Sequence, residues 1–244
     1  MVDRGEWPQY DGDPVLDGPL GYVVVHQDWV MAHGTLDERR WNGEILAFFN
    51  DYNTRLCYIT TEGDAVLYRA MTHPAGCPPL LPTQTAPGGY TLDLGQPGDE
   101  GFVGTGWFWA EPDFPGGSAR WAGDYAPAAP KSEPRREALL YASLPPGQSY
   151  TVTIRAIAYY TPRTVNVTAA NLVDGEVVAE SLGSITVQPG DWAEYTLPNP
   201  IPAEQLAATG GDLAFSLAAD GITPAGDRWL TLAYDWVQFR AVDP

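Results

Sequence analysis

The chain has 244 residues, of which 44% are hydrophobic and 12% aromatic, enough to build a core and to exclude a disordered chain. Its 13 basic and 31 acidic residues give a net charge of −18 without any cluster of Lys or Arg. That charge excludes nucleic acid as a partner and argues against an anionic membrane surface, because phosphate groups would be repelled. No apolar stretch reaches the roughly 18 residues that a membrane-spanning helix needs, so we expect no direct membrane insertion by this chain.

The first part of the chain, residues 1–72, reads as a small α/β segment. The β-branched run "GYVVVHQDWV" (21–30) predicts a strand, and "TLDERRWNGEILAFFNDYN" (35–53) carries apolar residues at helical spacing. The following "TRLCYITTEGDAVLYRA" (54–70) predicts two strands joined at "TEGD" as a hairpin. We therefore expect a strand, a helix and a hairpin, in that order.

A proline-rich linker, 73–87, is expected to follow, because this stretch shows no apolar periodicity. The two cysteines of the chain, Cys57 and Cys77, place one thiol in the hairpin and the other in the linker. They are either two unrelated thiols or a disulfide. If the protein matures outside the cytoplasm, we expect the disulfide, and it would pin the linker to the hairpin.

From residue 88 to 244 every segment reads as a strand followed by a turn. "SYTVTIRAIAYY" alternates apolar and polar positions, and "RTVNVTAANL" leads through "VDGE" into another strand as a hairpin. About eight or nine such strands without intervening helices are typical of an antiparallel β-sandwich, with jelly-roll topology as our first expectation. The predicted fold class is therefore mainly β, a sandwich preceded by the small α/β segment.

The stretch "GWFWAEPDFPGGSARWAGDYA" (106–126) concentrates aromatic rings between turns. Rings there either fill the core or form the platform of a binding site. Strand alternation would place Trp107 and Trp109 on one face, as core, and turn Phe108 away. The loop "EPDFPGG" then leaves the sheet, so Phe114 at its tip, or Trp121 and Tyr125 after it, are free to meet a ligand.

Proteins bind sugars by stacking a ring on the apolar face and by hydrogen-bonding the hydroxyl rim. The aromatic stretch has both kinds of group, and its carboxylates accept hydrogen bonds while Arg120 donates. The predicted carbohydrate-binding residues are Trp121, Tyr125, Phe114, Glu111, Asp113, Arg120 and Asp124. The alternative is that Arg120 and Asp235 form a buried pair, since Asp235 shares a strand face with Val237 and Phe239 and needs a partner there.

The sequence signals for a metal site or a catalytic site are weaker than those for a sugar site. Sandwiches of this type often hold a structural Ca²⁺, and carboxylates in three loops are candidate ligands: Asp99 and Glu100, Asp227, and Asp11, Asp13 and Asp17. No zinc motif, nucleophilic-serine motif or phosphate-binding loop is present in the sequence. We name no catalytic residue. A glycosidase would need two facing carboxylates, and with so many acidic residues the sequence neither locates nor excludes such a pair.

The stretch from about 100 to 241 resembles a galactose-binding-like β-sandwich, the jelly roll shared by many carbohydrate-binding modules. The resemblance rests on "FWAEPDFPGGSARWAGDYA", "ALLYASLPPGQSYTVTIRA" and "ITPAGDRWLTLAYDWVQF". Such sandwiches, preceded by a small strand–helix–hairpin element, are similar to the extracytoplasmic tails of bacterial polytopic envelope proteins, including glycosyltransferases. The catalytic acid of those enzymes lies in their membrane part, so the resemblance implies an accessory or binding role.

Three functions follow as expectations. The first is a non-catalytic module of a cell-envelope protein that binds a neutral glycan, since net negative charge does not repel a neutral ligand. The second is a structural extracytoplasmic domain whose partner is the membrane part of a longer parent protein. The third is a glycoside-active enzyme. An extracytoplasmic location would make this chain a fragment of a longer protein, because "MVDRGEWPQYDGDP" lacks the regions of a signal peptide.

Overall fold

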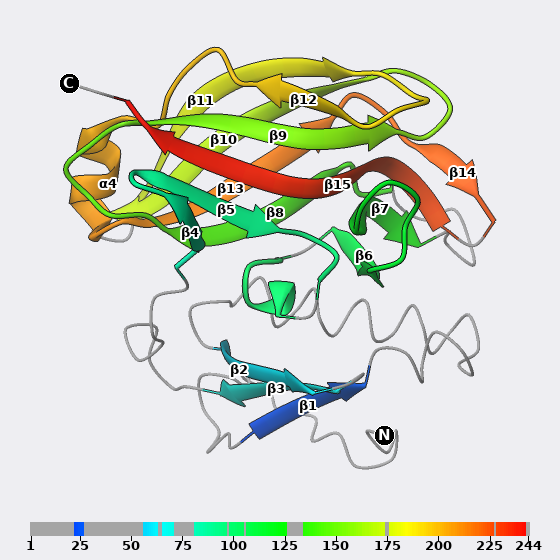
Figure 1. Ribbon diagram of the computed structural model, residues 1–244, viewed down its shortest axis with the longest axis horizontal. Coiled ribbons are helices and arrows are strands. Elements are labelled where there is room, and N and C mark those ends of the chain that lie inside the picture. Colours follow the sequence, from blue (N-terminus) through cyan, green and yellow to red (C-terminus); the bar gives the residue numbers. More distant parts are fainter. Residues whose placement is uncertain are drawn as a thin grey trace.

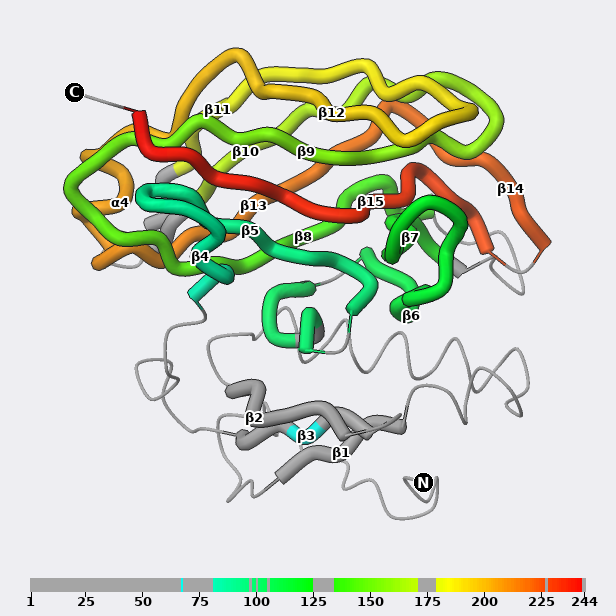
Figure 2. Tube along the Cα trace, in the orientation of Figure 1, coloured from blue at the N-terminus to red at the C-terminus, as the bar shows by residue number. Residues whose placement is uncertain are grey.

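The computed structural model describes residues 22–26, 56–62, 65–70, 81–96, 98–104, 106–125, 134–173, 176–226 and 228–242. The chain is mainly β, and two antiparallel sheets face each other as a sandwich (Figures 1 and 2). The predicted fold class is therefore confirmed.

The larger sheet has eight strands, and β12, β9, β15, β5 and β4 pair in that order. Strands β14 and β7 also pair with β15, and β6 pairs with β7. The strands of this sheet are β4 (Thr83–Ala86), β5 (Gly89–Asp93), β6 (Trp107–Glu111), β7 (Ala119–Tyr125), β9 (Tyr150–Ala158), β12 (Ala193–Thr196), β14 (Thr223–Ala225) and β15 (Arg228–Ala241). The long strand β15 thus joins the two halves of the sheet.

The smaller sheet has four strands in the order β11–β10–β13–β8. They are β8 (Glu137–Ser143), β10 (Arg163–Val173), β11 (Glu176–Val187) and β13 (Asp212–Ala219). Strands β10 and β11 form the predicted hairpin, with Val173 opposite Glu176. The connections β7–β8, β8–β9, β9–β10, β11–β12 and β12–β13 each cross from one sheet to the other, which is the connectivity of a jelly roll.

The main core lies between the two sheets. Strand β9 shows why: its residues alternate, and Tyr150, Val152, Ile154 and Ala156 are buried, as the sequence predicts. A pair of rings joins the sheets across this core, since Phe215 of β13 and Phe239 of β15 have centroids 5.3 Å apart. Burying one such ring stabilises the fold by about 1.5–3 kcal/mol.

Two short helical elements accompany the strands. The 3₁₀ helix η2 (Asp99–Gly101) precedes β6, and α4 (Ala203–Thr209) precedes β13. Helix α4 ends where Gly210 adopts a left-handed φ of 66° and its N–H bonds the carbonyl of Leu206. In the part of the chain that the structure describes, no helix is long and apolar enough to cross a membrane.

The amino-terminal part forms a three-stranded antiparallel sheet with the order β1–β3–β2. Its strands are β1 (Tyr22–His26), β2 (Leu56–Glu62) and β3 (Ala65–Ala70), so the predicted strand and hairpin are confirmed. The predicted helix at 35–53 lies outside the described residues, as does most of the linker. The division into segments 1–72, 73–87 and 88–244 stays a prediction.

Candidate ligand-binding pocket

A second apolar cluster lies on the outer face of the larger sheet, away from the main core. It consists of Phe108, Ala119, Trp121, Leu230 and Ala233. Strand β9 shows that this is the other face, because Ala156 and Ala158 are in the main core whereas Ile157 between them packs against the outer cluster. Apolar side chains on the outside of a sheet need a cover, and loops supply it here.

The aromatic stretch supplies rings to both faces of the sheet. Trp107 packs against the main core, with its ring 5.3 Å from that of Tyr234, and its Nε1–H donates to the carbonyl of Leu139 at 2.6 Å. Phe108 points to the outer cluster, as the predicted alternation requires. Trp109 is buried but belongs to neither cluster, because the β6–β7 register shifts between Trp107 and Ala110.

The loop 112–117 covers part of the outer cluster. Phe114 packs edge-on against Trp121 and Trp192, with centroid distances of 5.9 and 5.6 Å. Trp192 Nε1–H donates to the carbonyl of Pro115 at 3.0 Å, and Arg155 donates to the carbonyl of Gly116 at 3.2 Å. The loop is therefore held against the sheet and forms a fixed wall.

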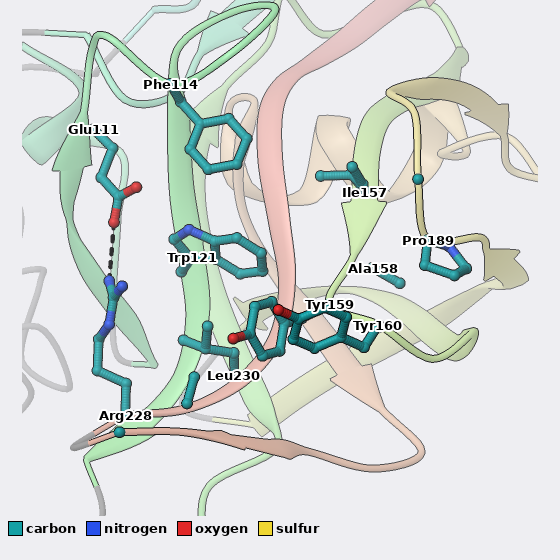
Figure 3. A pocket seen from close by; sticks show the side chains of 13 residues that line it. Glu111, Phe114, Trp121, Ile157, Ala158, Tyr159, Tyr160, Pro189, Arg228 and Leu230 are labelled. Atoms are coloured by element: carbon teal, nitrogen blue, oxygen red, sulfur yellow. Dashed lines mark hydrogen bonds and ion pairs between the residues drawn. The ribbon is translucent and has the colours of Figure 1, made fainter.

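Beside this wall is an open pocket of about 750 Å³ (Figure 3). Its lining comes from the loop after β6, from β7 and the end of β9, and from the β11–β12 and β14–β15 turns. The lining residues are Glu111, Phe114, Trp121, Ile157, Ala158, Tyr159, Tyr160, Pro189, Gly190, Ala225, Gly226, Arg228 and Leu230. The volume is that of typical small-ligand sites, which also combine apolar walls with a few polar groups.

Two adjacent tyrosines at the end of β9 form the aromatic part of the pocket. The Tyr159 ring packs edge-on against Trp121 at 5.5 Å, whereas the neighbouring Tyr160 ring, 4.3 Å from Tyr159, is 76% exposed. Tyr160 also has a φ of 60°, a left-handed conformation in which a bulky residue is rare. A hydrogen bond with Tyr160 raises the pKa of the Tyr159 hydroxyl above its ordinary value.

The polar part of the pocket is an ion pair. Arg228 Nη1 lies 2.9 Å from Glu111 Oε1, and the two side chains are 27% and 35% exposed (Figure 3). The guanidinium also lies over the Phe108 ring, 5.4 Å from its centroid, which fixes its position. Among the described lining residues these are the charged ones, so this part of the pocket has no net charge.

The structure brings together three of the predicted binding residues: Glu111, Phe114 and Trp121 line the pocket. Asp113 is exposed and does not line it. Asp124 accepts a hydrogen bond from the backbone N–H of Arg135 at 2.9 Å. The side chain of Tyr125 lies outside the described residues.

Arg120 is buried and does not line the pocket. Its Nε and Nη2 contact both carboxylate oxygens of Asp99 at 2.5 Å, and its Nη1 donates to the carbonyl of Phe108 at 2.8 Å. The second Asp99 oxygen accepts from the backbone N–H of Gly95 at 2.6 Å. This corrects two expectations, because Arg120 is not available to a sugar and its buried partner is Asp99.

Asp235 instead pairs with Arg155 and accepts a hydrogen bond from Ser118 at 3.3 Å. The β9–β15 register shifts between Tyr234 and Trp236, so Asp235 sits in a bulge. A one-residue bulge moves the side chain to the opposite face. The expectation that Asp235 shares a face with Val237 was therefore wrong.

Most residues named in the metal and disulfide expectations lie outside the described residues. Within the described residues, no group of three or more His, Cys, Asp or Glu side chains is placed to hold a metal ion. Asp99 is engaged by Arg120, while the side chains of Glu100, Asp227, Asp11, Asp13 and Asp17 lie outside the description. The same holds for Cys57 and Cys77, whose pairing stays a prediction.

Among the pocket residues that the sequence did not predict, Tyr159 and Tyr160 supply rings and Arg228 supplies the positive charge. A signal was available for the tyrosines, since "AYYTP" puts two rings where an alternating strand ends before a proline. Arg228 lies in "TPAGDRW", where Asp227 was expected as a calcium ligand and no sugar-binding residue was expected. Its distance of 117 residues from Glu111 hides the ion pair.

The sequence matches no family model and no curated protein. The chain is similar in structure to solved carbohydrate-binding modules. One is the C-terminal CBM6 of the laminarinase LamC from Zobellia galactanivorans, with 12% identity and a TM-score of 0.37, covering 62% of this chain and 98% of that one. Another is the CBM22-1 xylan-binding domain of Xyn10C from Paenibacillus barcinonensis, with 11% identity and a TM-score of 0.45, covering 63% and 94%.

Proposed function

We propose that this protein is a non-catalytic carbohydrate-binding module that holds a neutral glycan in the pocket around Tyr160. The observation that carries the proposal is the Tyr160 ring, which is 76% exposed above a pocket and held at a φ of 60°. A strained backbone conformation persists only where the surrounding structure enforces it, and such positions gather at binding sites. An exposed ring is also what stacking on the apolar face of a sugar requires.

The ion pair beside the rings supports a neutral ligand. Arg228 has five N–H donors and Glu111 four lone-pair sites, so their mutual contact leaves hydrogen-bonding capacity on both. Two neighbouring sugar hydroxyls fit this arrangement, one donating to Glu111 and the other accepting from Arg228. A charged sugar would instead compete with the pair.

The lining also supports binding without catalysis. Glycoside hydrolysis requires two carboxyl groups on opposite sides of the scissile bond. Among the described lining residues Glu111 is the single carboxylate, and it is engaged with Arg228. We further propose an extracytoplasmic, cell-envelope setting, which rests on the resemblance of the sequence to the extracytoplasmic tails of envelope proteins.

The test is glycan binding by Tyr160 variants. A glycan array of neutral polysaccharides identifies the ligand of the wild-type protein, and calorimetry then measures the affinity. Tyr160→Asn removes the ring but tolerates the left-handed backbone, so we expect about tenfold weaker binding, equivalent to roughly 1.4 kcal/mol, and an unchanged melting temperature.

Tyr160→Phe is the matched control, because it keeps the ring and removes only the hydroxyl. It should bind within about twofold of the wild-type protein, a difference of a few tenths of a kcal/mol. Absence of any glycan ligand for the wild-type protein, or wild-type affinity in Tyr160→Asn, would show that the pocket is not a sugar site.

A further inference from the structure

Two of the turns that line the pocket carry glycines. Gly190 lies in the β11–β12 turn and Gly226 in the β14–β15 turn, and both line the pocket. Among the described residues, and apart from its chain neighbours, a Cβ added to either would meet no heavy atom within 4 Å, so these residues leave the space beside both glycines open. From this geometry, and resting on the proposed function, we propose that the site takes an internal segment of a linear neutral polysaccharide, which leaves the pocket over Gly190 and over Gly226.

The first turn is fixed in place. Ala158 at the end of β9 donates its N–H to the carbonyl of Gln188 at 3.1 Å and pairs in a parallel bridge with Pro189. The turn therefore lies next to the two tyrosines that follow Ala158. Gly190 presents only backbone at this end, with a φ of 109°.

The second turn is equally well fixed. Strands β14 and β15 pair closely around it, with Ala225 opposite Arg228 and Thr223 opposite Leu230. Gly226 at its tip has a φ of 67°. The guanidinium of Arg228 is hydrogen-bonded to Glu111, so this side chain does not close the pocket beside Gly226.

The rings lie between these turns. In Figure 3 Pro189 and Arg228 are on opposite sides of the pocket, and Trp121, Tyr159 and Tyr160 lie between them. A site for the terminal sugar of a chain needs a closed end. Here the fixed wall is at Phe114, whereas the described residues leave the space beside Gly190 and Gly226 open, so in our proposal a chain crosses the rings and continues in both directions.

The experiment adds a side chain at one end. Asn adopts the left-handed region of Gly226 with little strain, so Gly226→Asn narrows the exit without disturbing the turn. Gly210→Asn is the matched control, because Gly210 has a φ of 66°, is also open to solvent, and lies at the end of α4 outside the lining. Calorimetry with cello-, xylo- and manno-oligosaccharides, from disaccharide to hexasaccharide, measures the effect.

For the series that binds, we expect affinity to rise with chain length in the wild-type protein. Gly226→Asn should weaken hexasaccharide binding by about fivefold while leaving the disaccharide within about twofold, and Gly210→Asn should match the wild type throughout. Wild-type affinity that stops rising at the disaccharide, or equal loss for both lengths in Gly226→Asn, would overturn the proposal while leaving the sugar site intact. Absence of binding at every length would overturn the proposed function as well.

A second measurement does not depend on the variant folding. Equal masses of the bound polysaccharide, intact and partly hydrolysed to long fragments, are titrated with the wild-type protein. An internal site gives nearly the same number of bound protein molecules per gram in both samples. A number that grows with the number of chain ends would overturn the proposal.

Discussion

The buried ion pair between Arg120 and Asp99 gives the largest predicted effect on stability. The side chains of Arg120 and Asp99 are 3% and 0% exposed, and Asp99 also accepts the N–H of Gly95. The change Asp99→Ala removes the carboxylate and leaves the guanidinium buried, with the carbonyl of Phe108 as a remaining hydrogen-bond partner.

The size of the effect follows from burial. Breaking one partner of a buried pair costs about 3–5 kcal/mol, because an uncompensated charge stays in the interior. For a domain of this size that corresponds to a fall in melting temperature of about 6–20 °C. The exposed pair of Arg228 and Glu111 is the matched comparison, because its side chains are 27% and 35% exposed. Removing this pair with Glu111→Gln should lower the free energy of unfolding by only about 0–1 kcal/mol.

Denaturant unfolding and calorimetry of Asp99→Ala, Arg120→Met and the double variant measure the coupling. We expect the double variant to be less destabilised than the sum of the two single changes, since it leaves no unpaired charge. If Arg120→Met instead keeps full stability and loses glycan binding, Arg120 is a ligand contact and the reasoning from burial is wrong.

Two further predictions concern the neighbourhood of this pair. Gly95→Ala should destabilise the fold by about 1–3 kcal/mol or more, because Gly95 has a φ of 85° and an added Cβ would lie 2.3 Å from the backbone nitrogen of Ala119. Gly147→Ala is the control in the same unfolding assay. Gly147 has a φ of 94° with open space around it, so this change measures the backbone strain without the steric clash. Burial, and then the charge of Asp235, raises the pKa of Asp93 above 3.8, so the folded state binds the proton more tightly than the unfolded state does. The stability that this protonation contributes is lost as the pH rises through the raised pKa. Asp93→Asn should therefore be more stable than the wild type at pH 7, and denaturant titrations should show the gain vanishing below about pH 3.8; a gain that is constant with pH would contradict it.

The strands could be predicted from the sequence because their signals are local. Alternation along "SYTVTIRAIAYY" marks the buried face of β9, and "VDGE" marks the β10–β11 hairpin, whatever the rest of the chain does. The uninterrupted strand signals after residue 88 also indicated a sandwich, since apolar faces on strands must be buried between sheets. Two rings of the predicted aromatic stretch, Phe114 and Trp121, line the candidate pocket.

The partners of individual side chains were decided by tertiary structure alone. Register shifts at Trp107/Ala110 and at Tyr234/Trp236 change which face a residue occupies, and no local pattern shows them. The shift at Tyr234/Trp236 places Asp235 beside Arg155. The candidate pocket depends on the same kind of long-range contact, since Glu111 meets Arg228 from 117 residues away. Periodicity specifies which residues face a sheet, whereas pairing between distant strands specifies which of them meet.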